Sequence, residues 1–316
     1  MSDFVSALLS SDLQLIRGVP KADLHNHLLL GMKVDRISGL SGRRIKPFQY
    51  NGNGIQDINN WISEQYIPVL KIPGIFPKLI EAGFQQAVDD GITVLEASID
   101  VGFGNLSGIP PEEVVETLRS AHQKVAPHMI FRPCLGFPRS LPVRKLLRFF
   151  EPYLDLNFFT SIDLYDDEMS QSVHNYREIY RFAKQMGFRC TAHVGEFGTA
   201  DQVREAVDAL DLDAVQHGIA AASSPDVMKW LAERSVPLNI CPTSNLVLQR
   251  VKSYATHPIR ILFDNGVKVT VNTDDVTLFN QGVSEEFLHL FQAGLFSAEE
   301  LDGIRESACP QTIINP

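Results

Sequence analysis

Eight short apolar or β-branched runs recur along the chain, and this recurrence constrains its fold more than any other feature. Between most of them lie stretches long enough for a helix, such as residues 110–125, 174–187, 200–210 and 224–235. The runs themselves cover residues 21–28, 92–99, 128–137, 156–165, 188–196, 213–219, 236–244 and 267–275. Alternating strands and helices in 316 residues predict one (β/α)8 TIM barrel over residues 1–316, with a doubly wound sheet as the alternative.

Residues 31–90, between the first two predicted strands, are too long and too mixed in composition for a single crossover helix. In barrels of this kind the loops that follow the strands build the site, so we expect this insertion to cap the mouth of the pocket. The candidates for its roof are the aromatic residues Phe48, Tyr50, Trp61, Tyr66 and Phe76. The alternative is that these aromatic side chains pack the insertion on itself.

The charge of the chain excludes two classes of partner. Lys and Arg number 28 against 38 Asp and Glu, a net charge of -10, so the summed field repels nucleic acid and anionic membranes.

The first residues lack a basic stretch ahead of their apolar ones, and no apolar run approaches the length that crosses a bilayer. We expect a cytoplasmic protein that acts on a small molecule, with its oligomeric state left open. Its cysteines have no C-x-x-C pair and are expected to be buried reduced thiols: Cys134, Cys190, Cys241 and Cys309.

Histidines and acids gather at the ends of the predicted strands. His25 and His27 lie two residues apart on the first strand, so their side chains project to one face. Three further polar sets fall where barrel enzymes hold their reacting groups, namely His193 with Glu196, His217, and Asp274 with Asp275. Ordinary polar packing is the alternative, but it must account for four coincident polar strand ends, each costly to bury without a partner.

Three imidazoles and one carboxylate form a ligand set that suits zinc, with other first-row divalent ions as alternatives. Such an ion makes hydroxide available from bound water near neutral pH. His217, a fourth histidine outside the ligand set, is then placed to orient this water, and Glu196 to deliver a proton to the substrate. Asp23 is a candidate for a hydrogen bond to a ligand histidine. The pattern predicts a hydrolytic metal site.

Several motifs, in order and spacing, resemble those of the adenosine deaminase branch of the metal-dependent amidohydrolases. They are "PKADLHNHL", "HVGE", "QHGI", "CPTSN" and "HPIRILFDNGVKVTVNTDD", and the similarity spans most of the chain. The resemblance implies that zinc is held by His25, His27, His193 and Asp274. It also implies that Glu196 protonates the ring nitrogen beside the attacked carbon, that His217 and Asp274 position the water, and that Asp275 binds the five-membered ring of a purine. Hydroxide would then add at C6 and ammonia would leave.

Two departures from the family pattern concern the substrate. Leu29 stands where adenosine deaminases have an aspartate that holds a ribose hydroxyl, and Asp166 stands where the family has a glycine whose N–H meets purine N3. Together with His27 and Asp275, these residues are the candidate substrate contacts. Residues 28–30, all leucine, predict an apolar rim that suits an apolar substituent or no ribose. The alternative is that the leucines pack in the core and the insertion holds the sugar.

The sequence therefore predicts a zinc-dependent hydrolytic deaminase of an adenosine-like or related aminated heterocycle. Other rings within the same class are adenine, 5′-methylthioadenosine, 6-amino-6-deoxyfutalosine and a pterin. A different class, a barrel that binds a purine without turnover, would require a broken catalytic set, whereas here the set is complete.

Overall fold

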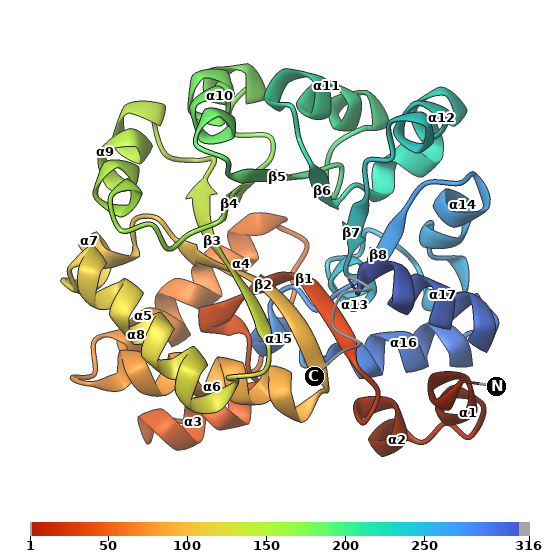
Figure 1. Ribbon diagram of the computed structural model, residues 1–316, viewed down its shortest axis with the longest axis horizontal. Coiled ribbons are helices and arrows are strands. Elements are labelled where there is room, and N and C mark those ends of the chain that lie inside the picture. The colour runs from red at the N-terminus through yellow and green to blue at the C-terminus, as the bar shows by residue number, and fades with distance from the viewer. Residues whose placement is uncertain (1, 310–316) are drawn as a thin grey trace.

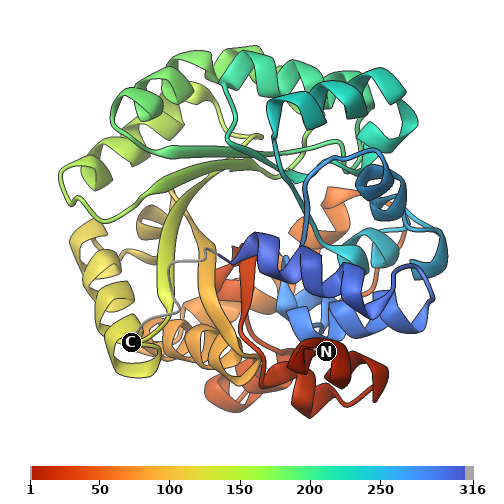
Figure 2. The same ribbon diagram turned by 45° about the vertical axis from the view of Figure 1, so that its right-hand side comes forward.

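The strands come together as one parallel sheet that curves into a barrel (Figures 1 and 2). In the computed structural model, which describes residues 2–309, the strands follow one another around the sheet in the order of the sequence. They are β1 (Lys21–His27), β2 (Ile92–Asp100), β3 (Ile130–Pro138), β4 (Ser161–Tyr165), β5 (Arg189–Val194), β6 (Ala214–His217), β7 (Leu238–Ile240) and β8 (Val269–Val271). Each predicted run overlaps one of these strands, so the predicted TIM barrel is confirmed and the doubly wound alternative is wrong.

The barrel closes where its first and last strands meet. The backbone N–H of Asp274, just after β8, donates to the carbonyl of His25 in β1 at 2.9 Å. Asn26 and Asp274 form a parallel bridge next to this bond, and the N–H of Leu24 donates to the side chain of Asn272 at 2.8 Å. The closure places the histidines of β1 beside the acids that follow β8.

Helices surround the sheet, as the view in Figure 2 shows. They are α1 (Asp3–Leu9), α2 (Leu13–Arg17), α3 (Val34–Ser41), α4 (Ile55–Trp61), α5 (Ile67–Leu70), α6 (Ile75–Asp89), α7 (Phe103–Ser107), α8 (Pro111–Val125), α9 (Val143–Leu154), α10 (Arg177–Gln185), α11 (Ala200–Leu210), α12 (Pro225–Arg234), α13 (Pro242–Val247), α14 (Ile259–Asp264), α15 (Val276–Phe279), α16 (Val283–Gln292) and α17 (Ala298–Ala308). Because they cover the outer face of the sheet, the strands are buried on both sides and read as apolar runs in the sequence.

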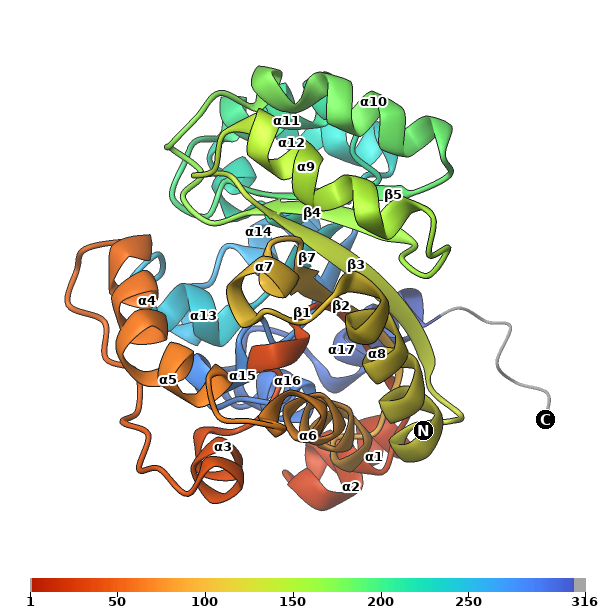
Figure 3. The same cartoon turned by 90° about the vertical axis from the view of Figure 1, so that its left-hand side faces the viewer.

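Residues 31–90 divide into two parts. The long helix α6 is the crossover between β1 and β2 and packs against α8. The segment before it, from α3 through α4, a π-helical turn η2 (Ile62–Tyr66) and α5, projects to one side of the barrel (Figure 3). Its apolar side chains form a hydrophobic cluster with the end of α13 and with α15, separate from the main core of the barrel. Residues of this cluster include Trp61, Leu248 and Phe279.

Two short helices, α1 and α2, precede the first strand and were not predicted. They lie beside α16 and α17, and the rings of Phe4 and Phe287 meet edge to face with centroids 5.2 Å apart.

No helix within residues 2–309 is long and apolar enough to cross a membrane. All four cysteines are free thiols; Cys134, Cys190 and Cys241 are buried as predicted, whereas Cys309 is only half-buried.

The contact between Gly83 of α6 and the turn that follows β1 gives a test of the packing. A Cβ at Gly83 would lie 2.7 Å from the carbonyl oxygen of Leu28. We expect Gly83→Ala to lower the free energy of unfolding by about 1–3 kcal/mol, although alanine favours helices, because α6 must move away from the barrel. Urea unfolding measures this. Gly303→Ala, at an exposed position in α17 with open space around it, is the control and should be neutral or stabilise by up to about 1 kcal/mol.

Candidate active site

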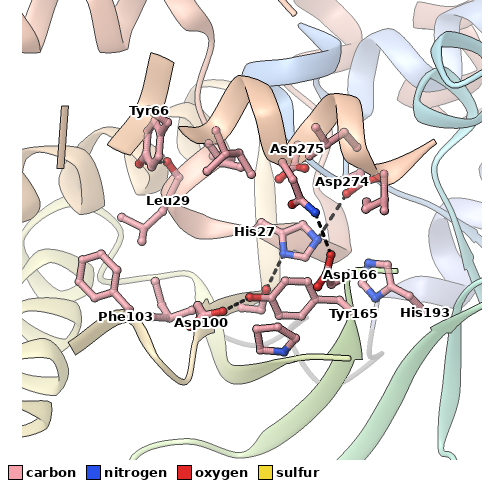
Figure 4. A pocket seen from close by; sticks show the side chains of 18 of the residues that line it. His27, Leu29, Tyr66, Asp100, Phe103, Tyr165, Asp166, His193, Asp274 and Asp275 are labelled. Carbon is pink, nitrogen blue, oxygen red and sulfur yellow. Dashed lines mark hydrogen bonds and ion pairs between the residues drawn. The ribbon is translucent and has the colours of Figure 1, made fainter. Parts of the chain in front are cut away.

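Three histidines and one aspartate converge at the carboxyl ends of β1, β5 and β8. The Nε2 atoms of His25 and His193 are 2.9 Å apart, and Oδ1 of Asp274 lies 3.4 Å from Nε2 of His27 and 3.7 Å from Nε2 of His25. One ligand atom from each of His25, His27, His193 and Asp274 lies within 4.8 Å of the others. Figure 4 shows His27, His193 and Asp274 around this point. The structure thus brings together the four residues predicted as metal ligands.

The opposite nitrogen of each imidazole ring has its own polar partner. These Nδ1 contacts are 2.9 Å to Asp163 Oδ2 for His193, 2.8 Å to Ser98 Oγ for His27, and 3.2 Å to the Asn239 carbonyl for His25. Such partners fix the ring orientation of metal-binding histidines and leave Nε2 free to bind. Three oriented imidazoles and a carboxylate fit a divalent ion that prefers nitrogen and oxygen ligands.

Asp23 does not contact an imidazole ring. Its carboxylate accepts hydrogen bonds from the Thr273 hydroxyl at 2.5 Å and the Asn26 amide at 3.1 Å, so it supports the β1–β8 closure instead. Asp23 contacts His25 only through the backbone N–H of that residue, at 3.5 Å, and the acid that contacts an imidazole ring is Asp163 of β4. Asp163 lies two residues before Tyr165, the last residue of β4, so the two side chains lie on the same face of the strand. Because Tyr165 lines the cavity, this is the face that points into the barrel.

Glu196 and His217 lie beside the cluster. The carboxyl group of Glu196 is 3.5 Å from Nε2 of His217, and its other oxygen accepts from the Ser244 hydroxyl at 3.4 Å and the Asn245 amide at 3.3 Å. Burial, with the charge of Asp274 close by, raises the pKa of Glu196 well above its usual range. A carboxyl group that keeps its proton at neutral pH is suited to act as a general acid.

The protonation of the cluster follows from burial and from its neighbours. Burial and the neighbouring histidines lower the pKa of His217 well below its usual value and that of His25 to about 3. Burial also lowers the pKa of His27, but the nearby carboxylates outweigh it and raise the value to about 9. The pKa of Asp274 is lowered despite its burial, because His27 and His25 stabilise its charge. Asp274 and the neutral imidazoles of His25 and His217 thus have the forms in which these side chains bind cations.

The cluster opens into a cavity of about 290 Å³ (Figure 4). Leu29 and Leu30 line it, whereas Leu28 is fully buried against α6, so only part of the predicted leucine rim exists. The insertion contributes aliphatic side chains from α4, η2 and α5, namely Ile55, Ile58, Ile62, Ile67 and Leu70. The wall away from the histidines is therefore mostly apolar.

Of the five aromatic candidates in the insertion, Tyr66 lines the cavity, and its hydroxyl donates to the carbonyl of Leu29. The others pack within the protein. Phe48 lies against Phe279, Phe76 against Phe103, the indole N–H of Trp61 donates to the carbonyl of Lys46, and Tyr50 accepts from the N–H of Gly54.

Asp275 and Asp166 face the cavity from different sides. Oδ1 of Asp275 is buried without a hydrogen-bond partner among the described residues, and burial raises the pKa of this carboxyl group to about 7. Asp166 has a positive φ of 75° and accepts from the Asn59 amide at 3.2 Å and from the Ser140 hydroxyl. Asp166 thus has a left-handed backbone conformation, which glycine adopts more readily than aspartate, and it adds a carboxylate to the cavity.

Sequence reasoning missed the groups that hold the predicted residues in place. Ser244 and Asn245 belong to the "CPTSN" motif, and Glu168 ends the "DLYDDE" segment whose first residue is Asp163. Glu168 accepts hydrogen bonds from the backbone on both sides of Glu196. Their positions within motifs could have indicated these residues, but the motifs alone do not say what they contact.

A parallel (β/α)8 barrel with a His-x-His pair on its first strand, and with histidines and an aspartate that could hold a metal clustered at its strand ends, is typical of the amidohydrolase class. The sequence profile of the adenosine deaminase family matches residues 20–315. A Treponema pallidum protein provisionally named adenosine/adenine deaminase is 33% identical over 93% of this chain and 99% of its own length. An adenine deaminase of Rhodopseudomonas palustris is 30% identical over 90% of this chain and 87% of its own length.

A solved Burkholderia ambifaria amidohydrolase with bound zinc has a TM-score of 0.75 at 22% identity, over 95% of each chain, and supports the fold. The chain belongs to the adenosine deaminase family. It is a hydrolytic deaminase of the adenine and adenosine type, in a family that depends on a metal.

The contact between Asp163 and His193 should strengthen metal binding, and a substitution at Asp163 tests this. We expect Asp163→Asn to lower metal affinity about 10- to 100-fold, because the amide holds the His193 ring less firmly and lowers its basicity. Competition against a chromogenic chelator measures this. Asp167→Asn is the control, since Asp167 accepts from the backbone of Met169. Equal affinities of the two variants would contradict the assigned role.

Proposed function

We propose that this protein is a zinc-dependent enzyme that replaces the 6-amino group of an aminopurine with oxygen and releases ammonia. The observation that carries the proposal is the convergence of His25, His27, His193 and Asp274, with the carboxyl group of Glu196 and the imidazole of His217 at their side. The zinc-bound Burkholderia ambifaria structure supports the choice of metal.

Bound zinc would lower the pKa of a water molecule and so make it a nucleophile at neutral pH. His217 and Asp274, with Nε2 and Oδ2 3.7 Å apart, orient the attacking water and hold its proton. Glu196 gives its proton to ring nitrogen N1 as the water oxygen bonds to C6. The C6–N bond then breaks as the amino group takes up the proton held by His217 and Asp274 and leaves as ammonia. The hydroxyl proton on the oxygen returns to Glu196, so the ring keeps a C6=O group.

The same residues fix the orientation of the base. With C6 at the metal cluster and N1 toward Glu196, the five-membered ring lies toward Asp275, whose buried Oδ1 is free to pair with it. Asp166 faces the N3 edge, and Leu29 and His27 complete the substrate contacts. Because N9 lies across the ring system from N1 and C6, a substituent on N9 points away from Glu196, toward the apolar part of the cavity.

Polar side chains in this distal part already have partners. The Tyr165 hydroxyl donates to Asp100, the Tyr66 hydroxyl to the carbonyl of Leu29, and Asp166 accepts from Asn59 and Ser140. A ribose would bury hydroxyl groups among them, each left unpaired at about 1–3 kcal/mol. Among the described residues that line the cavity none is Lys or Arg, so a phosphate has no cationic partner there. The substrate is therefore an adenine-like base, bare or with an apolar N9 substituent.

A comparison of purines tests the activity itself. We expect the zinc-loaded protein to release ammonia from adenine, and Glu196→Gln to lower kcat at least about 10²-fold because the proton donor is gone. Ammonia release and ultraviolet absorbance are measured, with metal content checked in both proteins. A wild type that binds aminopurines without releasing ammonia from any of them would favour the non-catalytic barrel and contradict the proposal.

Adenosine and 9-propyladenine, which carry a polar and an apolar substituent on N9, test the preference for an apolar substituent. We expect kcat/KM for adenosine to be about ten- to a hundredfold below that for 9-propyladenine. Leu29→Asp, which adds an acceptor, should raise the adenosine to 9-propyladenine ratio about tenfold. The control Leu29→Met keeps an apolar side chain of similar volume and should keep the wild-type ratio. A wild type that prefers adenosine would refute the assignment of the cavity.

A further inference from the structure

Glu168 lies behind the loop that carries Glu196 and has no part in the chemistry assigned so far. It follows β4, is 6% exposed, and accepts three backbone hydrogen bonds. Its Oε2 receives the N–H of Gly195 at 2.7 Å, and its Oε1 receives those of Gly198 at 2.7 Å and of Phe197. The bonds therefore come from residues on both sides of Glu196, while the Glu196 side chain points to Ser244 and Asn245.

The loop is shaped to come this close to Glu168. Gly195 has a φ of 73°, and a Cβ there would lie 2.3 Å from Cγ2 of Val203. A Cβ at Gly198 would lie 3.1 Å from Oε2 of Glu168 and 2.5 Å from Oε1 of Gln202. The two glycines let the backbone approach α11 and the carboxylate, so the position of Glu196 depends on contacts made behind the loop.

Burying a carboxylate requires compensation, and here the compensation comes from the loop. Three backbone N–H groups donate hydrogen bonds to Glu168 and replace the water that burial removes. Glu168 lines a cavity of about 220 Å³ behind the loop, and Arg139, which is also 6% exposed, lines it too. An amide in place of this carboxylate would keep one acceptor and turn an N–H₂ group toward the N–H of Gly195.

We propose that Glu168 is a positioning residue that holds the loop of residues 195–198 so that Glu196 points at the ring nitrogen it protonates. The proposal rests on the function proposed above. Small displacements of an acid relative to its substrate lower the rate steeply, by about 10²-fold for 1 Å. Losing the anchor should therefore lower kcat and leave the histidine cluster and the affinity for the base largely unchanged.

Hydrogen exchange tests the anchor without any turnover. In Glu168→Gln, the backbone amides of residues 195–198 should exchange at least about tenfold faster than in the wild type. Glu205→Gln is the matched control, because Glu205 lines the same cavity but pairs with His174 at 2.8 Å. Equal exchange in wild type and Glu168→Gln overturns the proposal, even if the protein deaminates no purine and the proposed function fails.

Kinetics tests whether the anchor acts through Glu196. Glu168→Gln should lower kcat on adenine about 10- to 100-fold, with KM and zinc content within about twofold of the wild type. In a Glu196→Gln background the same substitution should change the residual kcat less than about threefold, because the group that it positions is absent. If Glu168→Gln lowers kcat by the same factor in both backgrounds, the positioning role is overturned. It is also overturned if the wild type is active and Glu168→Gln has the same kcat.

Discussion

The closure of the barrel between β1 and β8 is the interaction on which the site depends. It joins residues about 25 and 274, almost the two ends of the described chain, through the backbone bond from Asp274 to His25 and the bond from Leu24 to Asn272. Buried polar groups specify this junction, because each would be costly without its partner. A slip by one residue would turn His25 and His27 out of the barrel and would separate them from Asp274.

Three residues that line the cavity have a strained backbone. His217, Asp274 and Asp166 all have positive φ, at 62°, 62° and 75°, although none is glycine. Such conformations cost on the order of 1–3 kcal/mol each and persist only where the surroundings impose them. For His217 and Asp274 the surroundings are strand ends with fixed neighbours. For Asp166 they are hydrogen bonds from Asn59 and Ser140, the first of which joins the insertion to the barrel.

The barrel and the convergence of the three histidines with Asp274 were predictable because both follow from strand periodicity. Eight apolar runs gave the strands, and the polar residues at their ends meet at one edge of any parallel barrel. The leucines after His27 show where this reasoning stops. The strand ends at His27 and a 3-10 turn, η1 (Leu28–Leu30), begins, so the alternation of a strand no longer assigns sides. Leu28 then points to α6, while Leu29 and Leu30 line the cavity.

The insertion and the partners of the site residues could not be predicted for a different reason. The packing of the insertion depends on contacts with α13 and α15, more than 150 residues away in the sequence, so the sides taken by Trp61 and Phe48 had no local signal. Asp23 and Asp163 are both acids that point into the barrel from strands. Only the register between neighbouring strands decides that Asp163 reaches His193 and that Asp23 reaches Thr273.

This division has a consequence for how such a barrel can change its substrate. The histidines and Asp274 lie at or next to strand ends, where the register that forms the core also fixes their geometry. The residues that line the rest of the cavity lie on η1, on the turn after β4 and on the insertion, which are held by a few local contacts. Leucine at position 29 or aspartate at position 166 therefore alters the cavity without disturbing the histidines. Substrate preference can diverge along this wall while the chemistry remains that of the family.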